Sequence, residues 1–241
     1  MDVLVIENLV KYFGGLIAVD HLNVSFSTGE IVGLIGPNGA GKTTLFNLIT
    51  GTFSPDQGKI IYKGKDISGL KPHATCRRGI GRTFQVPRPF SSLKVFDNVL
   101  VACFPKSRSR AEAQEKSEEL LRFVGLHEKK AVLAKHLTLV DRKALEMAKA
   151  LASDPTLLLL DEVMAGLNEK EANDTISLIN RIAGRKIGIV VIEHIFKVII
   201  KITNRVIVLD HGKKIAEGDA NSVMNDENVI KAYFGEDYAV A

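Results

Sequence analysis

The segment 36–44 has the residue types and the spacing that cradle a chain of phosphates. Its sequence, GPNGAGKTT, matches the pattern G-x-x-x-x-G-K-[ST] at every fixed position. Glycines let backbone N–H groups approach phosphate oxygens at positions where a Cβ would clash. Lys42 would supply a positive charge to the β- and γ-phosphates, and the Thr43 hydroxyl could bind Mg²⁺. The motif therefore predicts a site for a nucleoside triphosphate together with Mg²⁺.

The segments on either side of this motif favour the strand–loop–helix geometry that it needs. Residues 30–35, EIVGLI, indicate a buried strand, and residues 43–49, TTLFNLI, indicate a helix. That helix would point its positive N-terminal end at the phosphates. The residues expected to contact the nucleotide through this loop are Asn38, Gly39, Ala40, Gly41, Lys42, Thr43 and Thr44.

A second apolar run ends in two acidic residues. Residues 157–160 are four leucines, and Asp161 and Glu162 follow them. Ligands of parallel α/β sheets bind at the carboxyl ends of the strands, so such a strand would bring both carboxylates to the edge of the phosphate loop. We expect Asp161 to hold Mg²⁺, directly or through water, and Glu162 to polarise the attacking water. The alternative is a strand that ends in solvent-exposed acids, and the phosphate loop upstream makes it the less favoured interpretation.

Two further polar residues follow possible strands. His194 ends the segment VVIEH, and we expect it to approach the γ-phosphate as a stabilising group. Gln85 follows Arg82-Thr83-Phe84, and it could reach the metal ion or the attacking water. A single His at a strand end is more often structural, and a single Gln is uninformative, so both assignments depend on the other motifs.

The elements that would position these residues alternate between strands and helices. Strands are expected within residues 3–35, 59–62, 157–160, 187–192 and 205–209, and residues 92–152 have a helical character. The pattern predicts an α/β fold with a mainly parallel sheet covered on both faces and an inserted helical segment. We expect one domain over residues 1–241, with 1–85 and 154–241 as the α/β core and 86–153 as the helical subdomain.

Composition excludes several classes of protein. The chain has 241 residues, a hydrophobic fraction of 46% and a net charge of +4, which are ordinary values for a globular protein and do not indicate a nucleic-acid-binding face. Cys76 and Cys103 are far apart and form no metal or redox spacing. No apolar run approaches the ~20 residues of a membrane span. Any contact with a membrane is therefore expected to be peripheral and to pass through a partner.

The order of these motifs resembles that of the ATPase subunits of ABC transporters over essentially the whole chain. The resemblance implies the ABC ATPase variant of the P-loop NTPase fold, with an antiparallel β part beside the parallel sheet and a signature segment within the helical subdomain. It also implies ATP and Mg²⁺ as ligands and an aromatic residue that stacks on adenine. Lys11-Tyr12-Phe13-Gly14 matches that position, with Phe13 as our choice and Tyr12 as its close rival. Residues 165–168, AGLN, match the loop that follows the catalytic Glu in the family. Val163 departs from the family, because most relatives have proline there.

Two segments resemble more narrowly the branched-chain amino acid (Liv) type of importer ATPase. One is residues 81–90, GRTFQVPRPF, followed by residues 95–99, VFDNV, and the other is residues 229–236, VIKAYFGE. This resemblance implies uptake of branched-chain or related amino acids, at the cytoplasmic face of the cell membrane. It also implies a second ATPase subunit, two transmembrane permease subunits and, indirectly, a solute-binding protein.

The family's signature segment, Leu-Ser-Gly-Gly-Gln, is altered in this chain. It aligns with Leu137 and then with Thr138, Leu139, Val140 and Asp141. In the family this segment closes over the γ-phosphate of ATP bound to the opposite subunit, so a Cβ at Val140 and a carboxylate at Asp141 would be unfavourable there. The favoured alternative for Asp141 is structural: Thr138 and Asp141 have the spacing of a helix capping box.

Three functions remain open on these observations. The leading one is the ATP-hydrolysing subunit of an ABC importer, in a heterodimer or a homodimer. The second is an ABC ATPase outside transport, although a single module without heptad repeats argues against the kinds that carry two modules or coiled coils. The third is a regulatory nucleotide-binding subunit with weak hydrolysis, which the altered signature suggests and which intact Lys42, Asp161, Glu162 and His194 disfavour.

Overall fold

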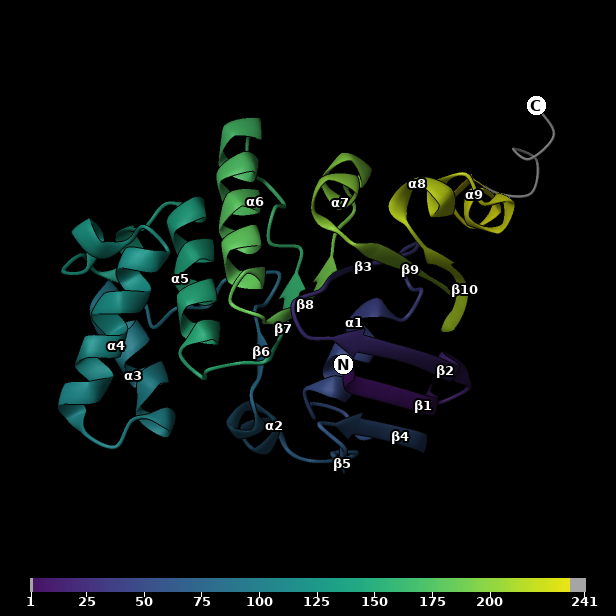
Figure 1. The fold of residues 1–241 in the computed structure, drawn as a ribbon, viewed down its shortest axis with the longest axis horizontal. Helices are drawn as coiled ribbons and strands as arrows, with labels where there is room; N and C mark the ends of the chain where they lie inside the picture. Colours follow the sequence, from purple (N-terminus) through teal and green to yellow (C-terminus); the bar gives the residue numbers. More distant parts are fainter. Residues whose placement is uncertain (1, 235–241) are drawn as a thin grey trace.

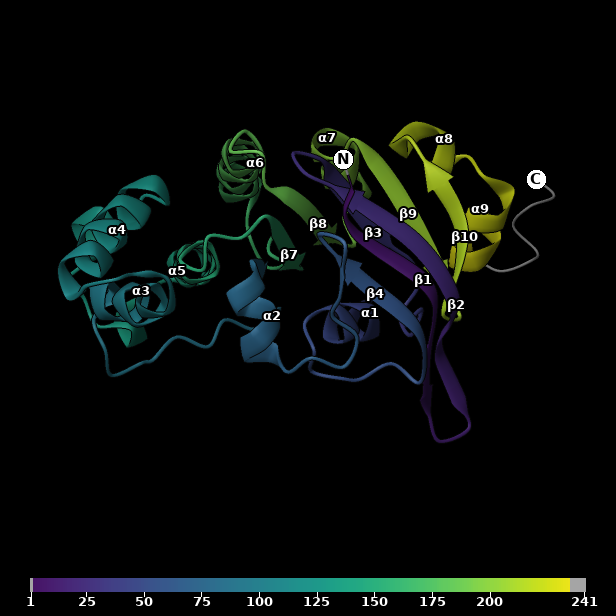
Figure 2. The same ribbon diagram turned by 60° about the horizontal axis from the view of Figure 1, so that its bottom comes forward.

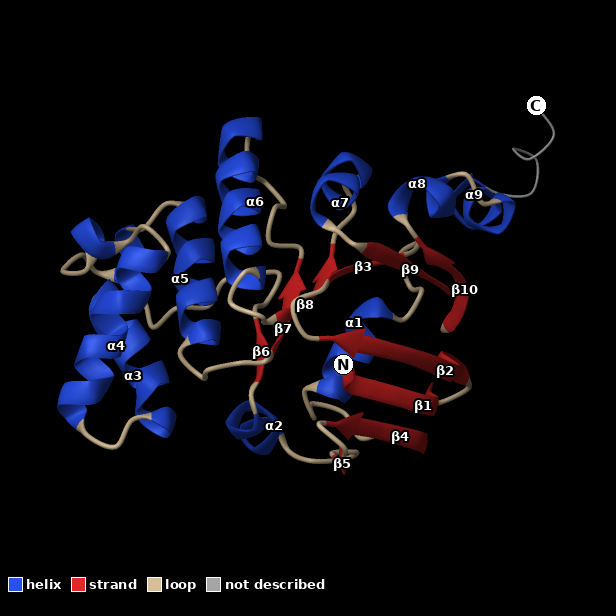
Figure 3. Cartoon of the chain, in the orientation of Figure 1, coloured by secondary structure: helices blue, strands red, loops and turns tan. Residues whose placement is uncertain are grey.

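A six-stranded sheet runs through the middle of the structure, a computed structural model that describes residues 2–234 (Figures 1 and 3). Its strand order is β10-β9-β3-β8-β7-β6. The pairs from β9 to β6 are parallel, and β10 is antiparallel to β9. The strands are β3 (Ile31–Ile35), β6 (Ile80–Arg82), β7 (Leu157–Asp161), β8 (Gly188–Ile192), β9 (Arg205–Asp210) and β10 (Lys213–Gly218).

A smaller sheet is entirely antiparallel and has the order β2-β1-β4-β5. It consists of β1 (Asp2–Phe13), β2 (Leu16–Ser27), β4 (Gln57–Tyr62) and β5 (Lys65–Asp66). The end of the β1–β2 hairpin extends away from the rest of the chain in Figure 2. This extension leaves Tyr12 and Phe13, at the end of β1, 38% and 41% exposed.

Helices cover the main sheet on both faces. Helix α1 (Lys42–Ile49) lies between the two sheets, and α6 (Glu169–Ala183), α7 (Phe196–Ile202), α8 (Ala220–Met224) and α9 (Glu227–Phe234) lie along the opposite face (Figure 1). A separate group at one end of the molecule contains α3 (Val95–Cys103), α4 (Arg110–Phe123) and α5 (Leu139–Leu151). Helix α2 (Pro72–Arg78) precedes β6. No helix within residues 2–234 is long and apolar enough to cross a membrane.

Two hydrophobic cores lie on the two faces of the main sheet, because successive side chains of each strand point to opposite faces. Leu158 and Leu160 of β7 belong to the core beneath the covering helices. Leu157 and Leu159 belong to the core around α1 and the antiparallel sheet. A parallel strand buried on both faces is a continuous apolar run, which explains the four consecutive leucines.

The predicted fold class is confirmed, and the structure adds detail that the sequence did not show. The strand β10, with the sequence KKIAEG, was not predicted, because an edge strand of polar residues has no apolar periodicity. Helix α5 begins at Leu139, directly after Thr138, which caps it. Gly235 and Glu236, the end of the Liv-type segment, lie outside the described residues. Helices α3 to α5 fall within residues 86–153, and the division of the chain into subdomains stays a prediction.

Candidate active site

The phosphate-binding loop joins β3 to α1, as the motif predicts. Gly36 and Gly41 have φ angles of 148° and 99°, in the region that favours glycine. A Cβ on Gly36 would lie 2.0 Å from the carbonyl oxygen of Leu209, and one on Gly41 would lie 2.3 Å from that of Ala18. Both glycines therefore make room for neighbouring strands, in addition to the role toward phosphate for which the motif selects them.

Lys42 is held inside this loop and is only 7% exposed. Its Nζ donates hydrogen bonds to the carbonyl oxygens of Gly36 and Pro37, at 2.7 and 2.8 Å. Burial lowers the pKa of Lys42, and the nearby charges of Glu162 and Asp161 oppose that shift. An ammonium group has three donors, so one remains for a phosphate oxygen.

Asp161 ends β7 and is almost fully buried. Its Oδ2 accepts a hydrogen bond from Nη2 of Arg82 at 3.1 Å, and its backbone N–H donates to Oγ1 of Thr83 at 3.2 Å. Burial raises the pKa of Asp161, and the guanidinium of Arg82 opposes that shift. The oxygen Oδ1 accepts no hydrogen bond from the described part of the chain, so it remains available to a cation.

The sequence analysis did not assign a role to Arg82. Its guanidinium also donates to Oδ1 of Asn47 at 2.6 Å, and it lies between the rings of Phe46 and Phe84, at 5.6 and 5.0 Å from their centroids. Arg82 thus connects α1, the end of β7 and the segment that leads to Gln85. A basic residue directly before Thr83-Phe84-Gln85 was the only sequence signal for it.

The predicted catalytic residues Glu162, Gln85 and His194 meet in the structure. Nε2 of Gln85 donates to Oε2 of Glu162 at 2.7 Å, and Nε2 of His194 contacts Oε1 at 3.0 Å. A carboxylate only accepts, so Nε2 of His194 carries the proton in this contact. Strands β7 and β8 are parallel neighbours with Asp161 opposite Ile192, which places the residues that follow both strands at one edge. The main chain of Glu162 is fixed there by its N–H, which donates to the Ile192 carbonyl at 3.0 Å.

The donors at this edge suit Mg²⁺ bound together with a nucleotide. Thr43 is exposed in the first turn of α1, Asp161 has one free carboxylate oxygen, and Gln85 offers an amide oxygen. Residues 2–234 contain no group of three or more His, Cys, Asp or Glu residues that could hold a metal ion. This agrees with Mg²⁺, which proteins typically bind through one or two carboxylates together with substrate phosphates.

The aromatic residue proposed for adenine has an accessible ring. Phe13 contacts Phe53 edge-on, with ring centroids 5.2 Å apart and an interplanar angle of 73°, and Lys11 lies 5.6 Å from its centroid. The backbone N–H of Tyr12 donates to Oδ2 of Asp56 at 2.6 Å. Both aromatic side chains remain partly exposed, so the choice between them stays a prediction.

The altered signature segment lies at the beginning of α5. Oγ1 of Thr138 accepts a hydrogen bond from the backbone N–H of Asp141 at 3.3 Å and donates to Oδ2 of Asp141 at 2.8 Å. The structural interpretation of this pair is thereby confirmed for the helix cap: Thr138 caps the helix, and the Asp141 carboxylate accepts a bond from the Thr138 hydroxyl. Lys129 was not predicted to take part, and its Nζ lies 2.7 Å from Oδ2 of Asp141. Burial would raise the pKa of Asp141, but the bonds from Lys129 and Thr138 outweigh it and lower the pKa.

The side chains on either side of Asp141 differ in their surroundings. Leu139 is 44% exposed. Val140 lines a hollow of about 190 Å³ between α5 and α6, together with Ala144, Met147 and Leu178. Val163, the other departure from the family, is 4% exposed and belongs to the core beneath the covering helices.

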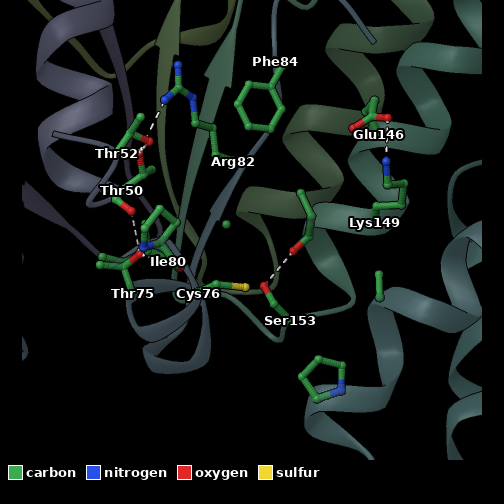
Figure 4. Close-up of a pocket in the computed structure, with 15 residues that line it drawn as sticks. Thr50, Thr52, Thr75, Cys76, Ile80, Arg82, Phe84, Glu146, Lys149 and Ser153 are labelled. Atoms are coloured by element: carbon green, nitrogen blue, oxygen red, sulfur yellow. Dashed lines mark hydrogen bonds and ion pairs between the residues drawn. The ribbon is translucent and has the colours of Figure 1, made fainter. Parts of the chain in front are cut away.

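A cavity of about 350 Å³ opens beside Arg82, between the core and the helical group. Figure 4 shows Arg82 and Phe84 on one side of it and Glu146 and Lys149 of α5 on the other. Glu146 and Lys149 form an ion pair at 2.7 Å. Cys76 of α2 lines the same cavity and is exposed, whereas Cys103 is buried elsewhere.

The fold and the site together define a P-loop ATPase of the cassette type, with a parallel core sheet, an antiparallel β part and a helical insert. Residues 19–165 match the family described as ABC transporter, and residues 213–239 match the family described as branched-chain amino acid ATP-binding cassette transporter. The chain belongs to the ABC transporter ATP-binding proteins, in their LivG-like branch. It is therefore an ATP-binding and ATP-hydrolysing subunit.

Curated relatives cover the chain almost completely. It is 36% identical to the high-affinity branched-chain amino acid transport ATP-binding protein LivG of Escherichia coli (strain K12), over 96% of this chain and 97% of the relative. It is 35% identical to the lipopolysaccharide export system ATP-binding protein LptB of Haemophilus influenzae, over 99% of both. A crystal structure of an ABC transporter cassette in its ADP conformation has a TM-score of 0.89 and 31% identity, over 98% of this chain and 100% of that one.

The exposed ring of Phe13 generates a prediction about nucleotide binding. Phe13→Ala should weaken ATP binding by about 1–3 kcal/mol, the range for one base stacked on one aromatic ring. GTP should bind nearly as well as ATP to the unaltered chain, because stacking reads the face of a base and not its edge. Calorimetric titration with both nucleotides measures this. Tyr12→Ala is the comparison, and a larger loss for Tyr12→Ala than for Phe13→Ala would assign the stacking to Tyr12 instead.

Proposed function

We propose that the edge of the sheet around Glu162 hydrolyses ATP with the following division of roles. Lys42 and the loop N–H groups hold the phosphates, and Thr43 and Asp161, with Gln85 nearby, would hold Mg²⁺. Bound Mg²⁺ would offset the charge that develops on the phosphates. Glu162 orients and polarises the attacking water, and His194 stabilises the γ-phosphate. The observation that supports this most directly is the meeting of Gln85 and His194 on the two oxygens of Glu162.

The role of Glu162 has a direct test. Glu162→Gln should keep ATP binding and trap the nucleotide-bound state, because the amide cannot polarise water as the carboxylate does. Removing a positioned base typically slows a reaction by ~10²–10⁴-fold. Steady-state ATPase rates of the transporter complex, with ATP binding measured in parallel, check this. A variant that turns over at the unaltered rate would remove Glu162 from the mechanism.

The substrate proposed for the transporter is a branched-chain or related amino acid, taken up into the cell. Support comes from the LivG relatives and from the match of residues 213–239 to the branched-chain family. The alternative is a different cargo, because LptB, which is named for lipopolysaccharide export, is 35% identical. Transport assays with reconstituted membrane subunits separate the two.

The cavity beside Arg82 is the proposed contact with a membrane subunit, at the cytoplasmic face of the membrane. It is bordered by Phe84, 53% exposed, and Arg82 connects it to Asp161 in the hydrolytic site. A segment seated there would therefore touch the same network that holds Asp161.

Cys76 provides a probe of this contact. A maleimide should modify Cys76 in the isolated chain, since it is exposed and lines the cavity, and assembly with the permease subunits should slow this reaction at least tenfold. Mass spectrometry of labelled peptides measures it. Cys103, 0% exposed, is the internal control and should stay unmodified in both samples. Equal labelling of Cys76 before and after assembly would place the membrane contact elsewhere.

The partner ATPase subunit is proposed to be a different chain with an unaltered signature. In a two-fold dimer, each ATP would lie between the phosphate loop of one subunit and the signature of the other. The Asp141 carboxylate would then lie at the ATP bound by the partner and would disfavour its phosphates. Lys129 offsets this charge in part, through the ion pair at 2.7 Å.

This asymmetry predicts opposite effects from two substitutions. In a complex whose own site is silenced by Glu162→Gln, the remaining turnover comes from the partner's site. Asp141→Gln should raise it by about tenfold, equivalent to about 1.4 kcal/mol of barrier. Lys129→Gln should lower it, because it leaves Asp141 unneutralised. Equal ATPase rates for all three complexes would show that Asp141 is only a helix cap.

A further inference from the structure

Two buried charged side chains support the loop that follows Glu162, and no motif of the sequence identified them. Lys143 of α5 is 6% exposed, and Glu193, directly before His194, is 3% exposed. Side chains of these types are rarely buried unless they are paired or hydrogen-bonded. Their positions beneath the loop therefore need an explanation that the hydrolytic roles given above do not supply.

The contacts of both side chains go to the main chain of this loop. Nζ of Lys143 donates to the carbonyl oxygens of Glu162 and Ala165, at 3.2 and 2.5 Å. Oε1 of Glu193 accepts the backbone N–H of Met164 at 2.8 Å. The loop is thus held from one side by a cation on its carbonyl oxygens and from the other by a carboxylate on an N–H group.

The two charges also influence each other. Burial lowers the pKa of Lys143, and the negative charges of Glu193 and Glu162 oppose that shift. Burial raises the pKa of Glu193, and its hydrogen bond from Met164 and the positive charge of Lys143 oppose that shift. Each charge therefore favours the charged form of the other, in addition to its bonds to the loop.

The main chain of Glu162 is in a conformation that needs such support. Its φ angle is 48°, in the left-handed region that a residue with a side chain rarely adopts. Backbone conformations of this kind persist only where the surroundings hold them. The hydrogen bond from Lys143 to the Glu162 carbonyl is part of that restraint, together with the bond from the Glu162 N–H to Ile192.

Lys143 also joins this loop to the signature segment. It lies on α5, five residues after Thr138 and two residues after Asp141, which form the beginning of the same helix. A second contact lies nearby: a Cβ built on Gly166 would be 3.2 Å from Cδ2 of Leu139. The first two turns of α5 thus contact the loop after Glu162 at two points, one polar and one apolar.

We propose that Lys143 is a positioning residue for hydrolysis, which sets the main chain of Glu162 and fixes it relative to the signature helix α5. This inference rests on the proposed role of Glu162 as the residue that orients water. Lys143 touches neither nucleotide nor water in this role; it acts through the peptide group of Glu162 and through Ala165. A displacement of about 1 Å in a catalytic group can slow a reaction about 10²-fold, so the restraint is large enough to matter.

The test compares Lys143→Met and Lys143→Arg in the assembled transporter. Lys143→Met should lower kcat by about 10–100-fold with the KM for ATP changed less than about twofold, because phosphate binding by Lys42 is untouched. Lys143→Arg, which keeps a cation and its donors, should recover most of the rate. Lys116→Met is the matched control, since it removes a lysine of α4 that pairs with Asp154, away from the loop.

A second pair of variants excludes a purely structural role. In the Glu162→Gln background, Lys143→Met should cause no further loss, because a residue that acts through Glu162 has nothing left to position. If Lys143→Met is unstable because Glu193 loses its counter-charge, the Lys143→Met/Glu193→Gln variant has neither charge and is used in its place. Melting temperatures measured in parallel identify any variant that fails to fold.

The outcomes separate this inference from the proposed function. An unchanged kcat in folded Lys143→Met, or losses that multiply in the Glu162→Gln background, overturn the positioning role alone. An unchanged rate in Glu162→Gln by itself overturns the proposed hydrolytic role of Glu162 as well. The proposal is supported if Lys143→Met lowers kcat and leaves KM unchanged, and Lys143→Arg keeps most of the unaltered rate. It also requires that Lys143→Met has no further effect in the Glu162→Gln background.

Discussion

The parallel pairing of β7 with β8 is the constraint on which the rest of the site depends. Asp161 pairs with Ile192, so the residues that directly follow the two strands lie side by side at the same edge of the sheet. Glu162 and His194 reach each other for this reason, and Glu193 lies where it can hold Met164. On the other side of β8, β3 leads into the phosphate loop. Three strands in one register thus bring the phosphate loop, the carboxylates and the histidine to one edge.

Buried charges of both signs maintain this edge. Lys42, Arg82 and Lys143 each lie among carbonyl or carboxylate oxygens, and Asp161 and Glu193 each accept a hydrogen bond. Burying one such charge alone is costly, and removing one partner leaves the other uncompensated. The network is therefore cooperative: a change at any one member affects the geometry of the others.

The cations of this network come from three different parts of the chain. Lys42 begins α1, Arg82 ends β6 and Lys143 lies on α5, so the edge of the sheet is tied to the phosphate loop, to the segment of Gln85 and to the signature helix. The cavity beside Arg82 and the segment around Asp141 lie at the far ends of two of these connections. The proposed membrane partner at the first and the proposed second cassette at the other would both act on the same carboxylates.

The sequence by itself determined the chemistry of the site and the class of fold. The phosphate loop, the leucine strand with Asp161 and Glu162, and the strands before Gln85 and His194 are local patterns, because a strand end or a glycine turn depends on neighbours in the chain. The alternation of strands and helices, in the same way, was enough to predict a parallel sheet covered on both faces. The capping role of Thr138 follows from a spacing of three residues and was also predictable.

Only the tertiary structure decided which side chains from distant segments meet. Arg82 and Asp161 are 79 residues apart, and Lys143 reaches a carbonyl 19 residues away through the packing of α5 on the core. A single arginine or lysine within a helix or strand has no local signal, because its role depends on the partner that packing provides. Lys129 had no local signal for the same reason. Together with Thr138, it lowers the pKa of Asp141, which burial alone would raise. Sequence patterns reflect interactions between residues that are close in the chain, whereas the buried charge pairs depend on contacts that exist only after the chain has folded.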